Sequence, residues 1–318
     1  MSANHIIVGA GAVGTATARL LADSGEYVTI ISRSGSGPEH PRIDRVGLDA
    51  GDVAALVALA AGDTGTAAIY NCVNPEYHRW TRDWPPIAAA LLAAAEASGA
   101  VLVMTGNLYP YGPVDGAITA SLPDAATGTK GRVRAQMWAD AKGAHDAGRV
   151  RAVEVRGSDY LGNGAESHIN RLVPRILAGK SVRVVGSADE PHSWTYVPDV
   201  ARTLVTVAAD ERAWGRRWLV PTNPPRTQRD AVHDLCRAAG VPPVKVGVVP
   251  HAAMRALGVV SPSIRELEET RYQLVQPFVI DASETGEAFG LASTGWDEAC
   301  AETVRWYRES RSAEMPRT

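Results

Sequence analysis

A glycine-rich stretch near the start of the chain, Gly9 to Gly14, constrains the fold more than any other feature. It follows the largely apolar run 5–8 and opens into the run 15–21, so it is typical of a turn between a strand and a helix. In such a turn Gly9 permits a tight bend, Gly11 lets the backbone approach a pyrophosphate, and Gly14 lets the helix pack on the strand. The alternative is an ordinary glycine-rich turn that binds no cofactor. The predicted cofactor contacts in this stretch are Gly9, Gly11, Ala12, Val13 and Gly14.

Strand and helix patterns alternate through the first half of the chain. The strand patterns fall at 6–8, 27–31, 46–48, 67–73, 101–104 and 150–155, and the helix patterns at 15–22, 52–61, 86–98 and 132–147. Strands separated by helices predict an α/β fold built on a doubly wound parallel sheet of the Rossmann kind.

The pattern changes after Gly157, where loops lengthen and Pro and Trp recur. Here we expect helices at 169–178, 228–239 and 296–307, and short strands at 182–185 and 218–220. We therefore assign residues 1–156 to a dinucleotide-binding domain and residues 157–318 mainly to a smaller substrate-binding lobe. Parts of 190–212 and the C-terminal segment are expected to return to the first domain.

The composition excludes several other classes of protein. A net charge of -3 over 318 residues predicts no basic surface for nucleic acid. Cys72, Cys236 and Cys300 lie far apart, which predicts neither a metal site nor a disulfide framework and favours a reducing compartment. The longest apolar run, 87–95, is too short to span a membrane, and the N-terminus leaves no room for a signal peptide. We expect a cytoplasmic protein.

Five segments together resemble the short-chain dehydrogenase/reductase superfamily, in its extended NAD-dependent epimerase/dehydratase branch. They are Gly9–Gly14, Leu48-Asp49, Met104–Gly112, Val155–Gly162 and Trp194–Ala201. The resemblance implies a nicotinamide cofactor, hydride transfer to or from a small hydroxyl- or carbonyl-bearing substrate, and a homodimer.

The chain departs from this family at the residues that transfer protons. The family's catalytic pair is a Tyr followed four residues later by a Lys, and here Lys130 and Arg134 stand at these positions. The family's catalytic Ser or Thr is matched by Asn107. The chain therefore resembles an atypical member that keeps the fold and changes the proton-transfer groups.

The predicted cofactor groove continues beyond the glycine stretch. After the second strand, Ser32 and Arg33 offer a hydroxyl and a guanidinium, which suit the 2′-phosphate of NADP better than the 2′-hydroxyl of NAD. Asp49 either meets the adenine, as the resemblance implies, or simply starts the next helix. The ends of the fourth and fifth strands add Asn71, Val73 and Thr105, since ligands lie beyond the carboxyl ends of the strands in such sheets. NADP is the expected cofactor, with NAD as the alternative.

Hydride transfer needs a nearby proton donor or acceptor, and the sequence offers several. Tyr109 is the first candidate for the acid, and Lys130 is the second because the charge of Arg134 would ease loss of its proton. Arg134 stays charged and can only bind, and Asn107 can only hydrogen-bond a carbonyl oxygen. The alternatives are that Tyr109 packs beside Pro110 and that the basic residues form a solvated face.

Candidate substrate contacts come from three places. Tyr111 lies two residues after Tyr109 and would share its side if the chain stayed extended. The resemblance implies that residues after Arg156 approach the substrate, and it places a substrate-binding residue just before Trp194. The candidates are Tyr111, Ser158, Asp159, Tyr160 and His192, with a structural role as the alternative for His192.

Three functions remain open at this point. The first is an NADP-dependent oxidoreductase or epimerase-like enzyme of the atypical kind. The second is a regulator or scaffold that binds NADP(H) without turnover, because the Tyr-Lys pair is missing. The third is a dehydratase or isomerase that retains bound NAD.

Overall fold

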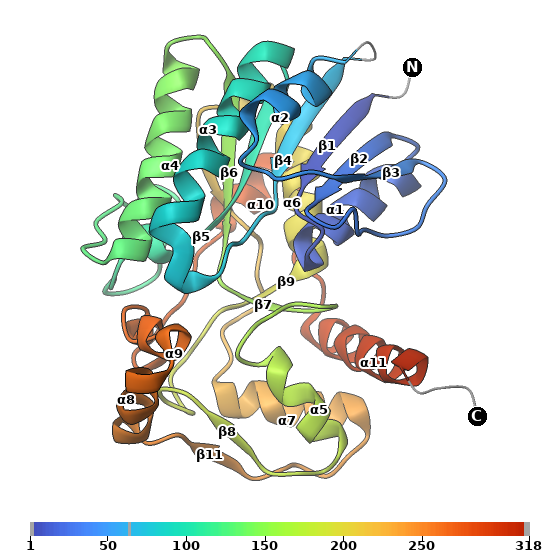
Figure 1. The fold of residues 1–318 in the computed structure, drawn as a ribbon. Coiled ribbons are helices and arrows are strands. Elements are labelled where there is room, and N and C mark those ends of the chain that lie inside the picture. The colour runs from blue at the N-terminus through green and yellow to red at the C-terminus, as the bar shows by residue number, and fades with distance from the viewer. Residues whose placement is uncertain (1–2, 63–64, 315–318) are drawn as a thin grey trace.

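The computed structural model describes residues 3–62 and 65–314, and a parallel sheet of seven strands forms its centre (Figure 1). Every pairing between neighbouring strands of this sheet is parallel. Across the sheet the order is β3 (Ile43–Gly47), β2 (Tyr27–Ser32), β1 (Asn4–Val8), β4 (Thr66–Asn71), β5 (Val101–Asn107), β6 (Arg151–Gly157) and β10 (Arg217–Leu219). The chain winds outward in one direction from β1 and in the other from β4, which confirms the predicted doubly wound fold.

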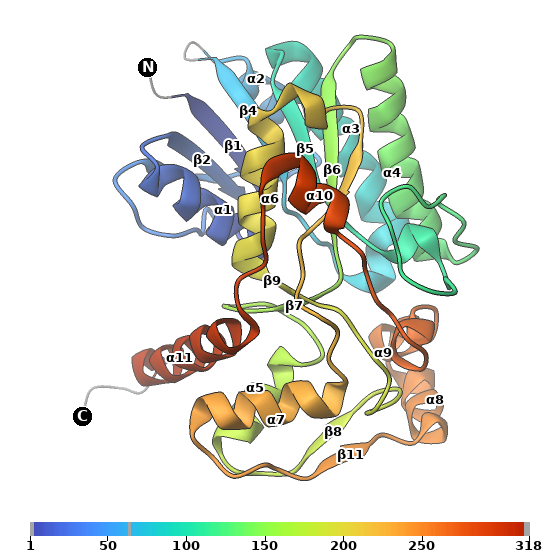
Figure 2. The same cartoon turned by 180° about the vertical axis from the view of Figure 1, so that it is seen from behind.

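Helices cover both faces of the sheet. One face carries α2 (Val53–Ala60), α3 (Trp80–Ser98) and α4 (Thr129–Asp146), as Figure 1 shows. The other carries α1 (Ala12–Asp23), α6 (Val197–Ala209) and α10 (Ser283–Phe289), as the reverse view in Figure 2 shows. Alternation along β1 divides the core accordingly: Ile7 faces α1 and α6, whereas Ile6 and Val8 face the opposite helices.

A smaller lobe lies beyond the carboxyl ends of the strands (Figures 1 and 2). Its helices are α5 (Val173–Leu177), α7 (Gln228–Ala239), α8 (His251–Val260), α9 (Pro262–Glu266) and α11 (Trp296–Glu314). Two short parallel pairs complete it, β8 (Val182–Val184) with β11 (Val246–Val248) and β7 (Asp159–Leu161) with β9 (Trp194–Tyr196). The pair β7–β9 lies between the large sheet and the rest of the lobe, so it brings residues of both parts together.

Several elements differ in their bounds from the sequence prediction, and three of these differences concern the central sheet and the helices that cover it. The third strand begins at Ile43 rather than Val46, and α3 begins at Trp80 rather than Pro86 because Trp80 and Trp84 are anchored in the core ahead of two tolerated prolines. The strand expected at 218–220 in the smaller lobe is β10, which instead forms an edge of the central sheet beside β6. No described helix is both long and apolar enough to cross a membrane.

Candidate active site

A cavity of about 960 Å³ opens at the carboxyl ends of β1, β2, β4, β5 and β6. Its floor is the glycine turn after β1, and its far end reaches Gln273 and Phe278 of the smaller lobe. The cavity lies where the strand order changes direction between β1 and β4, which is the usual ligand position in open α/β sheets.

The glycine turn has the geometry that a dinucleotide turn requires. Gly9 has a φ of 112°, and a Cβ on Gly14 would lie 1.9 Å from the Gly9 carbonyl oxygen, so neither position accepts a side chain. Gly11 has open space around it and lines the cavity with Ala12 and Val13. Gly14 is buried outside the lining and acts by holding α1 against the turn. The first turn of α1 thus faces the cavity with unpaired N–H groups and no acidic residue, as an anion site requires.

Polar side chains line the end of the cavity near β2 and β3. Arg33 is exposed on its rim, and no carboxylate pairs with it among the residues that the structure describes. Ser32 also lines the cavity, although its hydroxyl donates to the Ser36 carbonyl at 2.9 Å. Asp49 lines the cavity and accepts from the Gly51 N–H at 2.9 Å, whereas the cap of α2 is Asp52. The helix-start role that we considered for Asp49 therefore belongs to Asp52.

The middle of the cavity is formed by the ends of β4 and β5. Val73 and Thr105 line it, and Asn71 lies buried behind them, where its side-chain oxygen accepts from the Val73 N–H at 3.3 Å. The Asn71 amide nitrogen has no partner among the described residues. Asn71 therefore shapes the turn after β4 and does not line the cavity.

Three aromatic side chains gather where β5 ends. Tyr109 lines the cavity, its ring stacks on Trp80 at 5.9 Å between centroids, and its hydroxyl contacts the hydroxyl of Tyr77. Burial raises the pKa of Tyr109 well above its usual value, and the Tyr77 charge raises it further. Burial also raises the pKa of Tyr77. Both phenols are therefore protonated at neutral pH and act as hydrogen-bond donors.

Asn107 and Arg134 reach the same part of the cavity. Asn107 lines it, and its side-chain oxygen accepts from the Tyr109 N–H at 3.2 Å. Arg134 is 5 % exposed, donates to the Thr105 carbonyl at 3.2 Å, and lies 4.2 Å over the ring of Trp84. Its Nε has no partner among the described residues, so a buried cation with spare hydrogen-bonding capacity borders the cavity.

Lys130 does not reach the cavity. Its ammonium is 2 % exposed and pairs with Glu266 of α9 and, at 3.5 Å, with Glu269. The two carboxylates offset its charge on the side of α4 that faces the smaller lobe. The structure therefore pairs Lys130 with two carboxylates outside the cavity and gives it a contact between the two parts of the molecule.

Tyr111 also lies outside the cavity. Tyr109 to Tyr111 form a 3-10 turn instead of an extended segment, so two residues in sequence lie about two thirds of a turn apart. Tyr111 packs in a small core with Leu108 and Phe278, beneath the guanidinium of Arg156 at 4.6 Å. The shared side expected for Tyr109 and Tyr111 is wrong for this reason.

The segment after β6 contributes three cavity residues, Ser158, Asp159 and Tyr160. The Ser158 N–H donates to the Thr195 hydroxyl at 3.0 Å, and burial raises the pKa of Tyr160. His192 is 2 % exposed and lies behind the cavity wall, with its Nε2 3.0 Å from Oδ2 of Asp159. The structure thus joins two of the candidate substrate residues into one pair.

Sequence reasoning missed several cavity residues. Tyr77 is absent from the residues that the sequence analysis nominates, although its hydroxyl reaches Tyr109. Ser167, Gln273 and Phe278 come from segments of the chain that carry no recognisable motif, so no local pattern identifies them.

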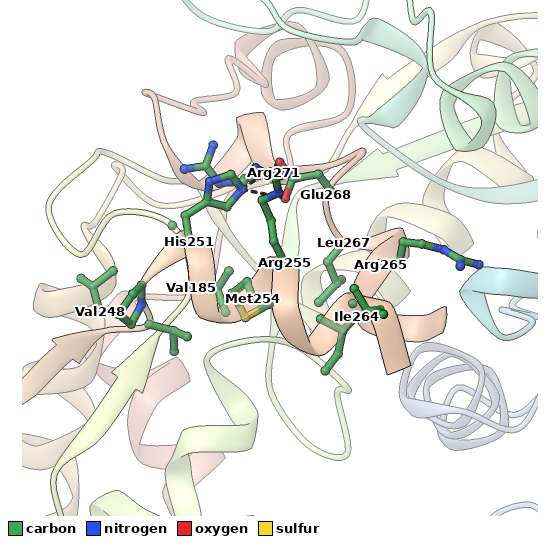
Figure 3. A pocket seen from close by; sticks show the side chains of 15 residues that line it. Val185, Val248, His251, Met254, Arg255, Ile264, Arg265, Leu267, Glu268 and Arg271 are labelled. Atoms are coloured by element: carbon green, nitrogen blue, oxygen red, sulfur yellow. Dashed lines mark hydrogen bonds and ion pairs between the residues drawn. The ribbon is translucent and has the colours of Figure 1, made fainter. Parts of the chain in front are cut away.

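A second cavity, of about 600 Å³, lies wholly within the smaller lobe (Figure 3). Met254, Ile264 and Leu267 give it an apolar wall, and His251 lies 3.0 Å from Glu268 at its edge. Among the described residues the two cavities share no lining residue. The 3-10 turn Arg271–Leu274 separates them, with Arg271 on one side and Gln273 on the other. The described residues contain no group of three His, Cys, Asp or Glu side chains placed to hold a metal ion.

Comparison with known proteins identifies the family and agrees with the fold. The model of the NAD dependent epimerase/dehydratase family matches residues 5–220. A dTDP-glucose 4,6-dehydratase from Bacillus anthracis, solved with NAD, superposes with a TM-score of 0.79 at 16 % identity, covering 98 % of each chain. A Thermotoga maritima UDP-glucose 4-epimerase, solved with UDP-glucose, gives 0.79 at 14 % identity over 97 % of this chain and 99 % of that one. An epimerase from Methanothermobacter thermautotrophicus gives 0.81 at 15 % identity over 98 % and 94 %. No curated protein sequence matches the chain.

Proposed function

Because this chain belongs to the NAD dependent epimerase/dehydratase family, we propose that it is an NADP-preferring oxidoreductase or epimerase-like enzyme acting on a small hydroxyl- or carbonyl-bearing substrate. The observation that carries the cofactor preference is Arg33, an exposed guanidinium on the cavity rim without a carboxylate partner among the described residues. A guanidinium in this position suits a 2′-phosphate, whereas a carboxylate would suit the 2′-hydroxyl of NAD.

We propose one direction for a dinucleotide along the cavity, with its adenine end near β2 and β3 and its nicotinamide end near β4 and β5. The N–H groups at the start of α1, with Gly11 in open space, would hold the pyrophosphate. Ser32 and Arg33 would hold the adenosine ribose with its phosphate, and Asp49 would meet the adenine. Val73 and Thr105 would then border the nicotinamide half. When bound, the nicotinamide supplies the hydride acceptor or donor.

The substrate would lie between the ends of β5 and β6 and the smaller lobe. Tyr109 and Asn107 would donate hydrogen bonds to its reacting oxygen, and Arg134 would hold a hydroxyl or an anionic group near it. Ser158 and Tyr160 would contact its other atoms. These assignments are supported by the one cavity that all of these residues line.

The test is calorimetric titration with NADPH and with NADH, on the unchanged protein and on Arg33→Ala. We expect Arg33→Ala to weaken NADPH binding roughly 10- to 100-fold, since a hydrogen bond to a charged group contributes about 1.5–3 kcal/mol, and to leave NADH binding unchanged. Arg19→Ala is the matched control, because Arg19 is exposed on α1 and lies outside the cavity lining. Binding of neither dinucleotide to the unchanged protein would overturn the proposal.

One observation favours a second function, a regulator that binds NADP(H) without turnover. Lys130 stands where the resemblance places the catalytic Tyr, and its side chain is engaged by Glu266 and Glu269. A regulator should bind NADPH and a partner protein in a redox-dependent way and show no turnover with a panel of sugars, alcohols and carbonyl compounds. The enzyme would be favoured if the unchanged protein turned over any panel member and if Tyr109→Phe reduced this turnover without changing NADPH affinity.

A further inference from the structure

The aromatic groups at the end of β5 are poorly suited to exchange a proton. A proton-transfer group works best when its pKa lies near the working pH, and burial raises the pKa of Tyr109 and of Tyr77 instead. Lys130 is held by Glu266 away from the cavity. A reaction that makes or consumes a hydroxyl in this cavity therefore needs another group for the proton.

Asp159 and His192 form a pair at the wall of the same cavity. Asp159 follows the end of β6, beside the end of β5, because Gly157 pairs with Asn107 in the sheet. Asp159 lines the cavity with its side chain 20 % exposed, and its Oδ2 lies 3.0 Å from Nε2 of the buried His192. His192 sits between the rings of Trp194 and Phe278, at centroid distances of 4.5 and 5.5 Å.

The hydrogen bond on the other side of the ring fixes the tautomer of His192. Nδ1 lies 3.1 Å from the carbonyl oxygen of Gln273, and because a carbonyl only accepts, Nδ1 carries a proton. Nε2 is then the site that gains or loses a proton, and it faces Asp159. Nε2 lies 3.0 Å from Oδ2 of Asp159 but makes no hydrogen bond of good geometry with any described residue. Contacts of catalytic groups commonly tighten when substrate binds.

We propose that Asp159 exchanges the substrate's proton and that His192 behind it stores this proton. The inference rests on the proposed enzyme function. In oxidation the O–H bond of the substrate breaks and its proton goes to the Asp159 carboxylate, while a bound nicotinamide cofactor would supply the acceptor for the hydride that leaves the C–H bond. Neutral His192 takes up that proton at Nε2, which leaves an imidazolium paired with a carboxylate. In reduction each transfer runs in reverse, and the dyad supplies the proton to the new hydroxyl.

The surroundings suit a dyad that titrates as a unit. Burial opposes ionisation of Asp159, but the contact with His192 and the charge of its imidazolium hold the Asp159 pKa below the usual value, so the carboxylate stays charged beside the imidazolium. The other groups whose charges reach Asp159 are Tyr77, Tyr109 and Tyr160, which are neutral because burial raises their pKa. Burial lowers the pKa of His168, which keeps it neutral as well. The geometry therefore leaves Nε2 of His192, beside the charged Asp159 carboxylate, as the atom at which the dyad takes up a proton.

The first test is kinetic and uses the NADP-loaded protein with a substrate found in the panel. We expect Asp159→Asn to lower kcat by about 10²–10⁴, the usual contribution of a positioned acid–base group, with NADPH affinity within twofold of the unchanged protein. In the unchanged protein the rate of oxidation should rise with pH as the dyad loses its proton, and His192→Gln should remove this limb of the pH profile. Tyr109→Phe should cost less than Asp159→Asn and keep that limb. The control is His168→Gln, which lies beside the pair and outside the cavity lining.

The second test needs no turnover. Nitrogen-15 NMR of histidine-labelled protein saturated with NADP⁺ should show His192 with its proton on Nδ1 at high pH and uptake of a second proton at Nε2 as the pH falls. Asp159→Asn should shift that uptake to lower pH, since it removes the carboxylate that stabilises the imidazolium. Full turnover in Asp159→Asn, or an Nδ1 without a proton, would overturn the dyad and leave the enzyme proposal intact. Tight NADPH binding with no turnover of any panel member would overturn both.

Discussion

At the scale of single residues, Gly11 and Gly14 carry different constraints although both belong to the turn after β1. A Cβ on Gly14 would meet the Gly9 carbonyl at 1.9 Å, whereas a Cβ on Gly11 would meet nothing within 4 Å. Gly14→Ala should therefore destabilise the fold by about 1–3 kcal/mol, the usual cost of overpacking. Gly11→Ala should leave stability almost unchanged and weaken NADPH binding, because its methyl group projects into the space proposed for the pyrophosphate.

Urea denaturation and calorimetric titration of both variants measure the two effects separately. Ala16→Gly on the same helix corrects for the flexibility that any glycine exchange introduces. If Gly11→Ala bound NADPH as tightly as the unchanged protein, the pyrophosphate would not lie against this turn.

At the scale of elements, a buried charge network joins β6, β10 and the loop before α4. Arg156 of β6 is 0 % exposed and contacts Glu154 at 2.8 Å and Asp124 at 2.7 Å. Arg217 of β10 meets the same Asp124 at 2.7 Å. One loop carboxylate thus ties two strands of the sheet together, close to where Asp159 leaves β6.

Arg156→Met should cost roughly 3–5 kcal/mol at neutral pH, because it leaves the Glu154 carboxylate buried without its closest partner. Burial already raises the pKa of Glu154. A carboxyl with a raised folded-state pKa is stabilising below its unfolded value, and that stability is lost as pH rises through the folded value. The deficit of Arg156→Met should therefore shrink as pH falls from 8 towards 5.

Denaturant unfolding at several pH values measures this deficit. Arg216→Met is the matched control, since Arg216 pairs with Glu284 on the surface and should contribute under about 1 kcal/mol. A deficit of Arg156→Met that stayed constant between pH 5 and 8 would contradict the explanation.

The elements that the sequence predicted well are those whose signals are local. The helix at 228–239 has its capping residue Thr227 and its terminal Gly240 beside it in the chain, and its predicted bounds are those of α7. β3 was misplaced because it is an edge strand in which only Ile43 is buried, so no alternating pattern marks its start. β10 was assigned to the wrong part of the molecule because strand pairing with β6 is a contact across more than 60 residues that no local pattern encodes.

The same distinction explains what could be predicted of the site. Most predicted cofactor contacts line one cavity, because each follows directly from a strand end whose position the fold determines. The substrate end depends on how the smaller lobe packs. The pairing of Asp159 with His192 and the presence of Gln273 in the wall follow from the β7–β9 pairing and from a loop about 80 residues further on. The family resemblance could nominate Asp159 and His192 but could not show that they form a pair.

At the scale of the whole molecule, Lys130 connects the central sheet with the smaller lobe. It lies in the first turn of α4, its ammonium pairs with Glu266 and Glu269, and its N–H donates to Glu269 at 2.5 Å. α9 in turn packs near the 3-10 turn Tyr77–Arg79, which carries a cavity residue. The contact therefore holds the lobe segment 262–274 over the substrate end of the cavity.

Lys130→Met should loosen that segment without unfolding the sheet. The two glutamates are 28 % and 25 % exposed and can hydrate when the ammonium is removed, so we expect a local cost of about 1–3 kcal/mol, below that of a fully buried pair. Amide hydrogen exchange in 262–274 should then accelerate roughly 5- to 150-fold, since each 1.4 kcal/mol is tenfold, while β1, β4 and β5 exchange as before. Lys142→Met is the control, because Lys142 pairs with Asp146 on the exposed side of the same helix.

A charge swap distinguishes the ion pair from simple loss of packing. Lys130→Glu places a third carboxylate beside Glu266 and Glu269 and should loosen the segment more than Lys130→Met, whereas adding Glu266→Lys should recover part of the protection. Lys130→Tyr gives this position the Tyr that the family resemblance places there. It should not raise turnover, because the side chain at this position faces α9 instead of the cavity. Unchanged exchange in Lys130→Met would mean that apolar packing alone holds the lobe, and a gain of turnover in Lys130→Tyr would mean that this position reaches the substrate in the working enzyme.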